Sequence, residues 1–78
     1  MTDVRQALEE ALRMVEAPAG DDDTPLELSS LQVVMLTEEI ERAFDVRLGA
    51  REVTRENFAT RRALRALLGS LTTTKAGT

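Results

Sequence analysis

The 78-residue chain contains no cysteine and no histidine. Their absence excludes disulfide bonds, thiol nucleophiles, histidine-based catalytic triads and zinc sites built from these residues. Tryptophan and tyrosine are also absent, and Phe44 and Phe58 are the only aromatic residues. Proteins that bind RNA or single-stranded DNA usually stack bases on aromatic side chains, so we expect no nucleic-acid partner. The length allows one small domain.

Basic residues are fewer than acidic ones, 10 against 14, and the two kinds are unevenly distributed. Residues 1–45 contain 12 acids and three bases, a net charge of −9, whereas residues 46–78 contain two acids and seven bases, a net charge of +5. This asymmetry has two interpretations. Either the acidic half attracts partners with a basic surface, or the two halves attract each other within the fold.

Long apolar runs are missing as well. The longest fully apolar run covers only residues 33–36, whereas a helix needs about 20 apolar residues to cross a bilayer. The N-terminal stretch is acidic and does not have the pattern of a signal peptide. We therefore predict a cytoplasmic, monomeric protein that has no membrane partner.

Apolar residues at helical spacing predict two long helices. In residues 3–16, with Asp3 as the cap, the i, i+3, i+4, i+7 template is filled by Val4, Ala7, Leu8, Ala11, Leu12 and Val15. In residues 30–44, one stripe is formed by Val33, Leu36, Ile40 and Phe44. Ser29 and Gln32 match an S-x-x-Q capping box at the start of this second helix.

Residues 17–29 contain two prolines, a glycine and three consecutive aspartates, which predict a loop. Such a loop is long for a connection between helices, so we expect it to cross the bundle, with Leu26 and Leu28 against the core. A short helix is predicted over residues 54–58. Another is predicted over residues 60–68, capped by Thr60 and stopped by Gly69.

The expected fold is therefore all-α: a small four-helix bundle with three main helices, one short helix and a long first loop. It occupies residues 1–69, and residues 70–78 are predicted to form a flexible tail. In residues 30–44, Leu31, Val34 and Met35 lie beside the main apolar stripe. They either widen the buried face or form an exposed apolar surface.

Few residues are suited to catalysis or metal binding. The aspartate run at residues 21–23 lacks the spacing of a calcium-binding EF-hand loop, and no glycine-rich phosphate loop or nucleophile elbow is present. We expect no metal site and no enzyme activity. Glu38, Glu39 and Glu41 are interpreted either as a solvated helix face or as a docking surface for a basic partner.

Ser30 stands out because it lies between the long loop and the predicted second helix. A helix N-terminus carries partial positive charge and free N–H groups, so a phosphate attached there is stabilised. The simpler alternative is that Ser29 and Ser30 serve only as caps.

The residues that follow Ser30 resemble the acyl carrier protein family. In that family an Asp-Ser-Leu motif opens the second helix, and the helix ends in an acidic run and a phenylalanine. Here the stretch over residues 26–45 has Ser30-Leu31 at the start and Phe44-Asp45 at the end, and residues 56–64 are similar to the family's third-to-fourth helix junction. The resemblance covers about residues 3–68.

The resemblance implies that Ser30 carries a 4′-phosphopantetheine arm derived from coenzyme A, and that the arm holds an acyl group as a thioester. It implies three kinds of partner: a phosphopantetheinyl transferase, an acyl- or aminoacyl-loading enzyme, and downstream transferases or synthases of polyketide, fatty-acid-like or other specialised biosynthesis. Cargo would be sheltered near Leu36, Ile40 and Phe58. The residues implied to dock partners are Leu31, Gln32, Val34, Met35, Glu38, Glu41 and Arg42.

The chain departs from the family pattern at several positions. Ser29 replaces the usual aspartate, Glu27 replaces a frequent glycine, and Met35 and Arg42 replace common acids. Two alternatives therefore stay open beside the stand-alone acyl carrier: a peptidyl or aminoacyl carrier, and a carrier-like interaction module that is never modified.

Overall fold

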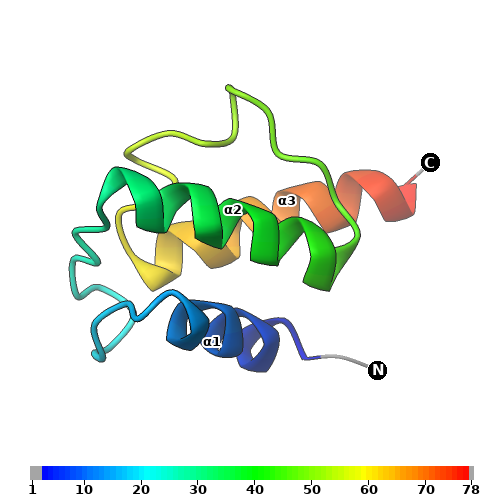
Figure 1. Cartoon of the computed structure of the whole chain (residues 1–78). Coiled ribbons are helices and arrows are strands. Elements are labelled where there is room, and N and C mark those ends of the chain that lie inside the picture. Colours follow the sequence, from blue (N-terminus) through cyan, green and yellow to red (C-terminus); the bar gives the residue numbers. More distant parts are fainter. Residues whose placement is uncertain (1–2, 78) are drawn as a thin grey trace.

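The computed structural model describes residues 3–77 and the side chains of residues 3–71. Within that part it contains three helices and no strand: α1 (Val4–Met14), α2 (Ser30–Phe44) and α3 (Arg61–Gly77) (Figure 1). Helix α1 packs against both α2 and α3. The all-α prediction is confirmed at this level, and two long connections, over residues 15–29 and 45–60, join the helices.

Local capping explains where α1 and α2 begin. Asp3 Oδ1 accepts a hydrogen bond from the N–H of Arg5 at 3.1 Å, so Asp3 is the N-cap of α1 as predicted. In α2 the predicted capping box is complete. Ser29 Oγ accepts from the N–H of Gln32 at 3.1 Å, and Gln32 Oε1 accepts from the N–H of Ser29 at 2.9 Å.

The predicted N-cap of α3 is also confirmed, since Thr60 Oγ1 accepts from the N–H of Ala63 at 3.1 Å. The predicted stop at Gly69 is wrong, because α3 continues to Gly77. A glycine inside a helix costs only about 1 kcal/mol relative to alanine, and Leu64 and Leu68 anchor the preceding turns in the core. The predicted tail is therefore helical up to Gly77, and Thr78 lies outside the described residues.

The short helix predicted over residues 54–58 is not confirmed. The segment forms hydrogen-bonded turns instead. The N–H of Phe58 donates to Thr54 O at 3.1 Å, and the N–H of Asn57 donates to Thr54 Oγ1 at 3.1 Å. Thr54 thus caps a single turn, and this turn carries Phe58 into the core, where it is 4% exposed.

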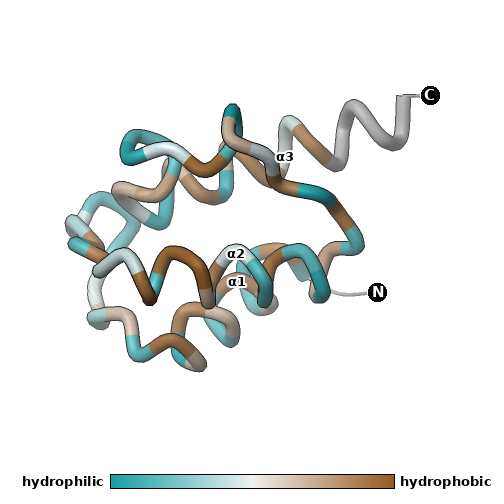
Figure 2. Tube along the Cα trace, turned by 45° about the horizontal axis from the view of Figure 1, so that its top comes forward, coloured by the Kyte–Doolittle hydropathy of each residue, from teal (hydrophilic) through white to brown (hydrophobic). Residues whose placement is uncertain are grey.

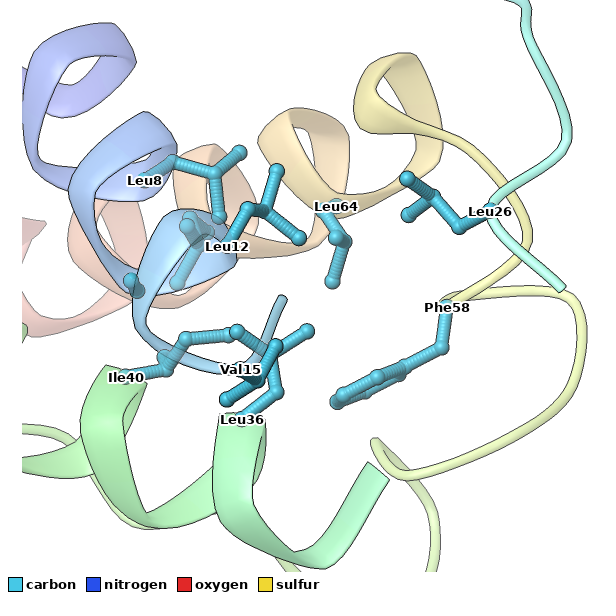
Figure 3. Packing of buried hydrophobic residues seen from close by; sticks show 10 residues of the cluster. Leu8, Leu12, Val15, Leu26, Leu36, Ile40, Phe58 and Leu64 are labelled. Carbon is cyan, nitrogen blue, oxygen red and sulfur yellow. The ribbon is translucent and has the colours of Figure 1, made fainter. Parts of the chain in front are cut away.

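The core lies where all three helices and both connections meet (Figure 3). Figure 3 shows Leu26 and Phe58 reaching inward from the connections toward side chains of the helices. The burial of Leu26 confirms that the long loop is anchored in the core, and Leu28 packs against it. The fully buried large side chains are Leu8, Leu12, Leu26, Leu36, Ile40, Leu64 and Leu68.

Hydropathy changes along α2, as Figure 2 shows: the first half of the helix is mostly brown and the second half is mostly teal. Leu36 and Ile40 from the predicted stripe are buried, while Val33 and Phe44 pack partly buried against the core. No helix in the described part of the chain combines the length and the apolar character that crossing a membrane requires.

Candidate functional site

Ser29 and Ser30 are adjacent, but their hydroxyl groups have different roles. Ser29 Oγ is engaged as the cap of α2. Ser30 is the first residue of α2 and is exposed, and its hydroxyl has no hydrogen-bond partner among the described residues. Of the two serines, Ser30 therefore presents the hydroxyl that is free to react.

The backbone around Ser30 adds two more donors. The N–H groups of Ser30 and Leu31 have no acceptor within the described part of the chain, as expected for the first turn of a helix. The N-terminus of a 15-residue helix also carries partial positive charge. A phosphate joined to Ser30 Oγ would therefore meet a complementary environment.

Gln32 connects this helix start to the end of α1. Besides completing the capping box, its Nε2 donates to the carbonyl oxygen of Val15 at 2.9 Å. Val15 is the C-cap of α1, and the following residue, Glu16, has a left-handed backbone with φ of 60°. The amide of Gln32 thus holds together the two ends of the long loop, and its hydrogen bonds are made inside the molecule rather than being free for a partner.

A cavity of about 410 Å³ is formed where α2 meets the two connections. Val33 of α2 contributes to the wall of the cavity. It lies three residues after Ser30, so the two residues are neighbours on the surface of the helix. The cavity is lined by Glu27, Leu28, Val33, Val53, Thr54, Arg55, Phe58 and Ala59. Of the three residues expected near a cargo, only Phe58 lines this cavity, and Leu36 and Ile40 lie in the core with no exposed surface.

Three apolar side chains of α2 face outward. Leu31 is 67% exposed, Val34 is 55% exposed and Met35 is 39% exposed. The alternative that they widen the buried face is therefore wrong. They form an exposed apolar surface that begins one residue after Ser30, a placement suited to contact with another protein.

The charged candidates for docking are only partly available. Glu38 is exposed and has no ion-pair partner among the described residues. Glu41 is half-buried, and its Oε2 accepts from the N–H of Leu48 at 2.8 Å, which ties the connection after α2 back to the helix. Arg42 forms a hydrogen-bonded ion pair with Glu39 on the same helix, although its side chain remains largely exposed.

Two aspartates of the first loop pair with arginines of α3. Asp22 and Arg65 lie 2.6 Å apart at their closest atoms, and Arg62 Nε lies 2.7 Å from Asp23 Oδ1. The hydrogen bond from Arg65 lowers the pKa of Asp22, and the hydrogen bond from Arg62 lowers the pKa of Asp23, each below the ordinary value of 3.8. These contacts join the acidic and basic halves, which confirms that the halves attract each other within the fold.

A third contact between the halves is more deeply buried. Arg61 is only 5% exposed, and its Nε donates to Glu9 Oε2 at 2.7 Å. Its Nη2 donates to Pro18 O at 3.0 Å, while Nη1 is buried without a partner in the described part of the chain. The neighbouring cavity of about 140 Å³ is lined by Glu9, Arg13, Ala17, Ala19 and Arg61.

The cavity beside α2 is the part of the site that sequence reasoning missed. Its walls come from residues 27–28 and 53–59, whose meeting depends on how two irregular connections fold over the helices. No periodic pattern marks such residues. Within the described residues, no group of three or more acids or other metal-binding side chains could hold a metal ion.

Comparisons of this chain with models of known families, with curated proteins and with solved structures find no match.

Proposed function

We propose that the chain is a stand-alone acyl carrier protein, and that Ser30 Oγ is the attachment point of a 4′-phosphopantetheine arm. One observation carries the proposal. Ser30 Oγ is exposed and unbonded in the described part of the chain, while the neighbouring Ser29 provides the helix cap. The serine at this position in the resembled family is the modified one, and the chain keeps its hydroxyl available.

The residues present fit such a group. Ser30 Oγ supplies the atom for a phosphodiester bond, and the free N–H groups of Ser30 and Leu31 can donate to the phosphate oxygens. The arm, once attached, supplies a terminal thiol that holds an acyl group as a thioester, which accounts for a carrier without cysteine. The chain contributes an attachment point and a surface, and partner enzymes perform the chemistry.

Partner recognition is assigned to the outward surface of α2. Leu31, Val34 and Met35 offer apolar contact area close to Ser30, and Glu38 adds one unpaired negative charge. Partners that must bring an active site to Ser30 necessarily approach this end of the helix. Because this surface is mainly apolar, we expect docking to depend less on ionic strength than docking between purely charged surfaces.

Intact-protein mass spectrometry tests the proposal. The wild-type protein, Ser30→Ala and Ser29→Ala are each incubated with coenzyme A and a broad-specificity phosphopantetheinyl transferase. We expect the mass of one phosphopantetheine to be added to the wild type and to Ser29→Ala, and none to Ser30→Ala. Modification of Ser30→Ala would contradict the assignment of the site. Circular dichroism of the same samples shows whether each variant is folded.

A second function is favoured by one specific feature, the serine at position 29 in place of the family's aspartate. It removes a negative charge from the approach to Ser30. If the folded wild type gains no mass with any of several transferases, the chain acts instead as an unmodified interaction module that binds through the apolar surface of α2. If the wild type does gain phosphopantetheine, loading tests with acyl- and aminoacyl-transferring enzymes separate an acyl carrier from an aminoacyl carrier.

A further inference from the structure

Gln32 uses both ends of its side-chain amide at the start of α2. Its Oε1 accepts from the N–H of Ser29 at 2.9 Å, and its Nε2 donates to the carbonyl oxygen of Val15 at 2.9 Å. The first bond lies within the helix start, whereas the second reaches the C-cap of α1, 17 residues away in sequence. One amide group therefore fixes the residue before Ser30 and attaches it to another helix.

The first turn of α2 has few other attachments to the body of the protein. Leu36, which follows Ser30 by more than one helical turn, is the first residue of α2 that is buried. Val33 is only half-buried against the core. Within the described part of the chain, no hydrogen bond other than those of Gln32 joins residues 29–33 to anything outside α2 and its cap. The direction in which Ser30 is presented therefore depends on Gln32.

This arrangement differs from the docking role that the resemblance implies for Gln32. Its side chain is half-buried, and both its oxygen and its nitrogen are already hydrogen-bonded inside the molecule. Leu31 and Val34, in contrast, are exposed and are free to contact a partner. Gln32 thus acts on the carrier itself rather than on the surface that a partner touches.

We infer that Gln32 is a positioning residue for the modification of Ser30. Its bond to Val15 holds the start of α2 at a fixed place on the end of α1, so that Ser30 Oγ is presented to the transferase in one orientation. The orientation of an attacking group governs the rate within a bound complex. The inference rests on the proposed function and deepens it, because it names a residue that controls the loading step.

In the loading step one bond forms and one breaks. Ser30 Oγ bonds to the phosphorus atom of coenzyme A that bears the pantetheine, and the bond from this phosphorus to the bridging oxygen of the diphosphate breaks. Adenosine bisphosphate leaves with that oxygen, and the hydroxyl proton passes to a base in the transferase. Because Ser30 Oγ must lie in line with the breaking bond, a loosely held helix start lowers the fraction of productive complexes.

Two substitutions have in common the loss of the donor to Val15. Gln32→Glu keeps an acceptor for the N–H of Ser29, because glutamate completes a capping box as glutamine does, but an ionised carboxylate has no donor. Gln32→Met has neither group and adds no charge. Gln6→Glu makes the same chemical change as the first variant at an exposed position of α1, and it serves as the matched control.

Steady-state kinetics of loading from coenzyme A, with one broad-specificity transferase, give kcat and KM for each variant. We expect Gln32→Glu and Gln32→Met to lower kcat about three- to tenfold, the change in an equilibrium that the loss of one hydrogen bond produces. Their KM should stay within about twofold of the wild type, because the exposed apolar surface is intact. Gln6→Glu should match the wild type in both constants. Circular dichroism shows whether each sample is folded.

A second measurement needs no transferase. The N–H of Val33 donates to Ser29 O at 2.9 Å, so its amide hydrogen exchange reports the opening of the first turn of α2. We expect both Gln32 variants to lower the protection factor of this N–H about three- to tenfold. Gln6→Glu should leave it unchanged.

A lower kcat in Gln32→Met alone would assign the effect to the capping box and overturn the role of the bond to Val15. A raised KM with an unchanged kcat would make Gln32 a docking residue and would overturn the inference as well. If the folded wild type is never loaded, the proposed function fails, and the protection of the Val33 N–H alone decides whether Gln32 holds the start of α2. Unchanged protection in both variants would contradict that role.

Discussion

Arg61 Nε and Glu9 Oε2 lie 2.7 Å apart and join the start of α3 to the middle of α1, across 52 residues of sequence. The arginine is buried, whereas the glutamate side chain is 38% exposed. The pair therefore sits at the border of the core. If Glu9 is removed, the guanidinium of Arg61 stays buried and still carries its desolvation penalty, now without a partner. Glu9 and Arg61 therefore contribute unequally to stability.

Replacing Glu9 with alanine should lower the free energy of unfolding by about 1–2 kcal/mol, less than for a fully buried pair because Glu9 is partly solvated. Urea unfolding followed by circular dichroism measures this change. Glu10→Ala is the control, since Glu10 is an exposed neighbour on the same helix, and its effect should stay within about 0.5 kcal/mol. The double variant Glu9→Ala/Arg61→Met should recover most of the loss, because the charge is then no longer buried. Equal effects of Glu9→Ala and Glu10→Ala would contradict this account.

Acid should loosen the attachment of the first loop to α3. Asp22 and Asp23 have lowered pKa values in the folded protein, owing first to the hydrogen bonds from Arg65 and Arg62. The unfolded chain binds protons more readily at these groups. Their contribution to stability is therefore present above the ordinary value of 3.8 and is lost as the pH falls through the lower folded values.

Thermal unfolding at about pH 6 and about pH 3 tests this dependence. The wild type should exceed an Asp22→Asn/Asp23→Asn variant in Tm at the higher pH, and the advantage should shrink at the lower pH. High salt should also reduce it, because these pairs are exposed. An advantage that is the same at both pH values would show that the carboxylate charges are not responsible.

The capping box of α2 predicts different effects at two adjacent serines. Ser29→Ala removes the acceptor of the Gln32 N–H and should lower stability by about 1 kcal/mol. Ser30→Ala, at an exposed helix position, should leave stability unchanged or raise it slightly, since alanine favours helices. Urea midpoints of the two variants give the comparison. A larger loss at Ser30 would mean that the roles of the two hydroxyl groups are reversed.

Gly69 predicts a stabilising substitution. It lies inside α3, and a Cβ atom built there meets nothing within 4 Å. Gly69→Ala should raise stability by about 0.5–1 kcal/mol through helix propensity. Gly20→Ala is the opposite case, because its Cβ would lie 2.7 Å from Thr24 Oγ1, and it should lower the melting temperature. A loss of stability in Gly69→Ala would argue against a continuous α3 through this position.

Local patterns predicted the helices that bury an apolar stripe. The stripe from Val33 to Phe44 and the Ser29–Gln32 pair together identify α2 with its observed bounds. The end of α3 was mispredicted because Gly69 weakens a helix without stopping it. Thr54 and Phe58 were expected to lie in a helix, yet a cap and an anchor four residues apart need only one turn.

Contacts distant in sequence could not be predicted. The aspartate run at residues 21–23 reads as a solvated loop, because the pairing of Asp23 with Arg62 spans 39 residues and follows from the packing of α3. The cavity depends in the same way on two irregular connections. Glu27 is a partial exception. It occupies a position where the resembled family often has glycine, and its φ of 50° is a conformation that glycine adopts without strain.

The first loop is attached to the body of the protein at several points. Gln32 binds the carbonyl of Val15 at one end, Asp22 and Asp23 hold α3, and the N–H of Leu26 donates to Ala59 O at 2.9 Å. Pro18 O accepts a hydrogen bond from Arg61 Nη2, so the exposed residues 19–20 are the part that lies between these attachments. A single proteolytic cut there would separate α1 covalently from the rest of the chain, yet the two fragments would stay together as a folded, noncovalent complex.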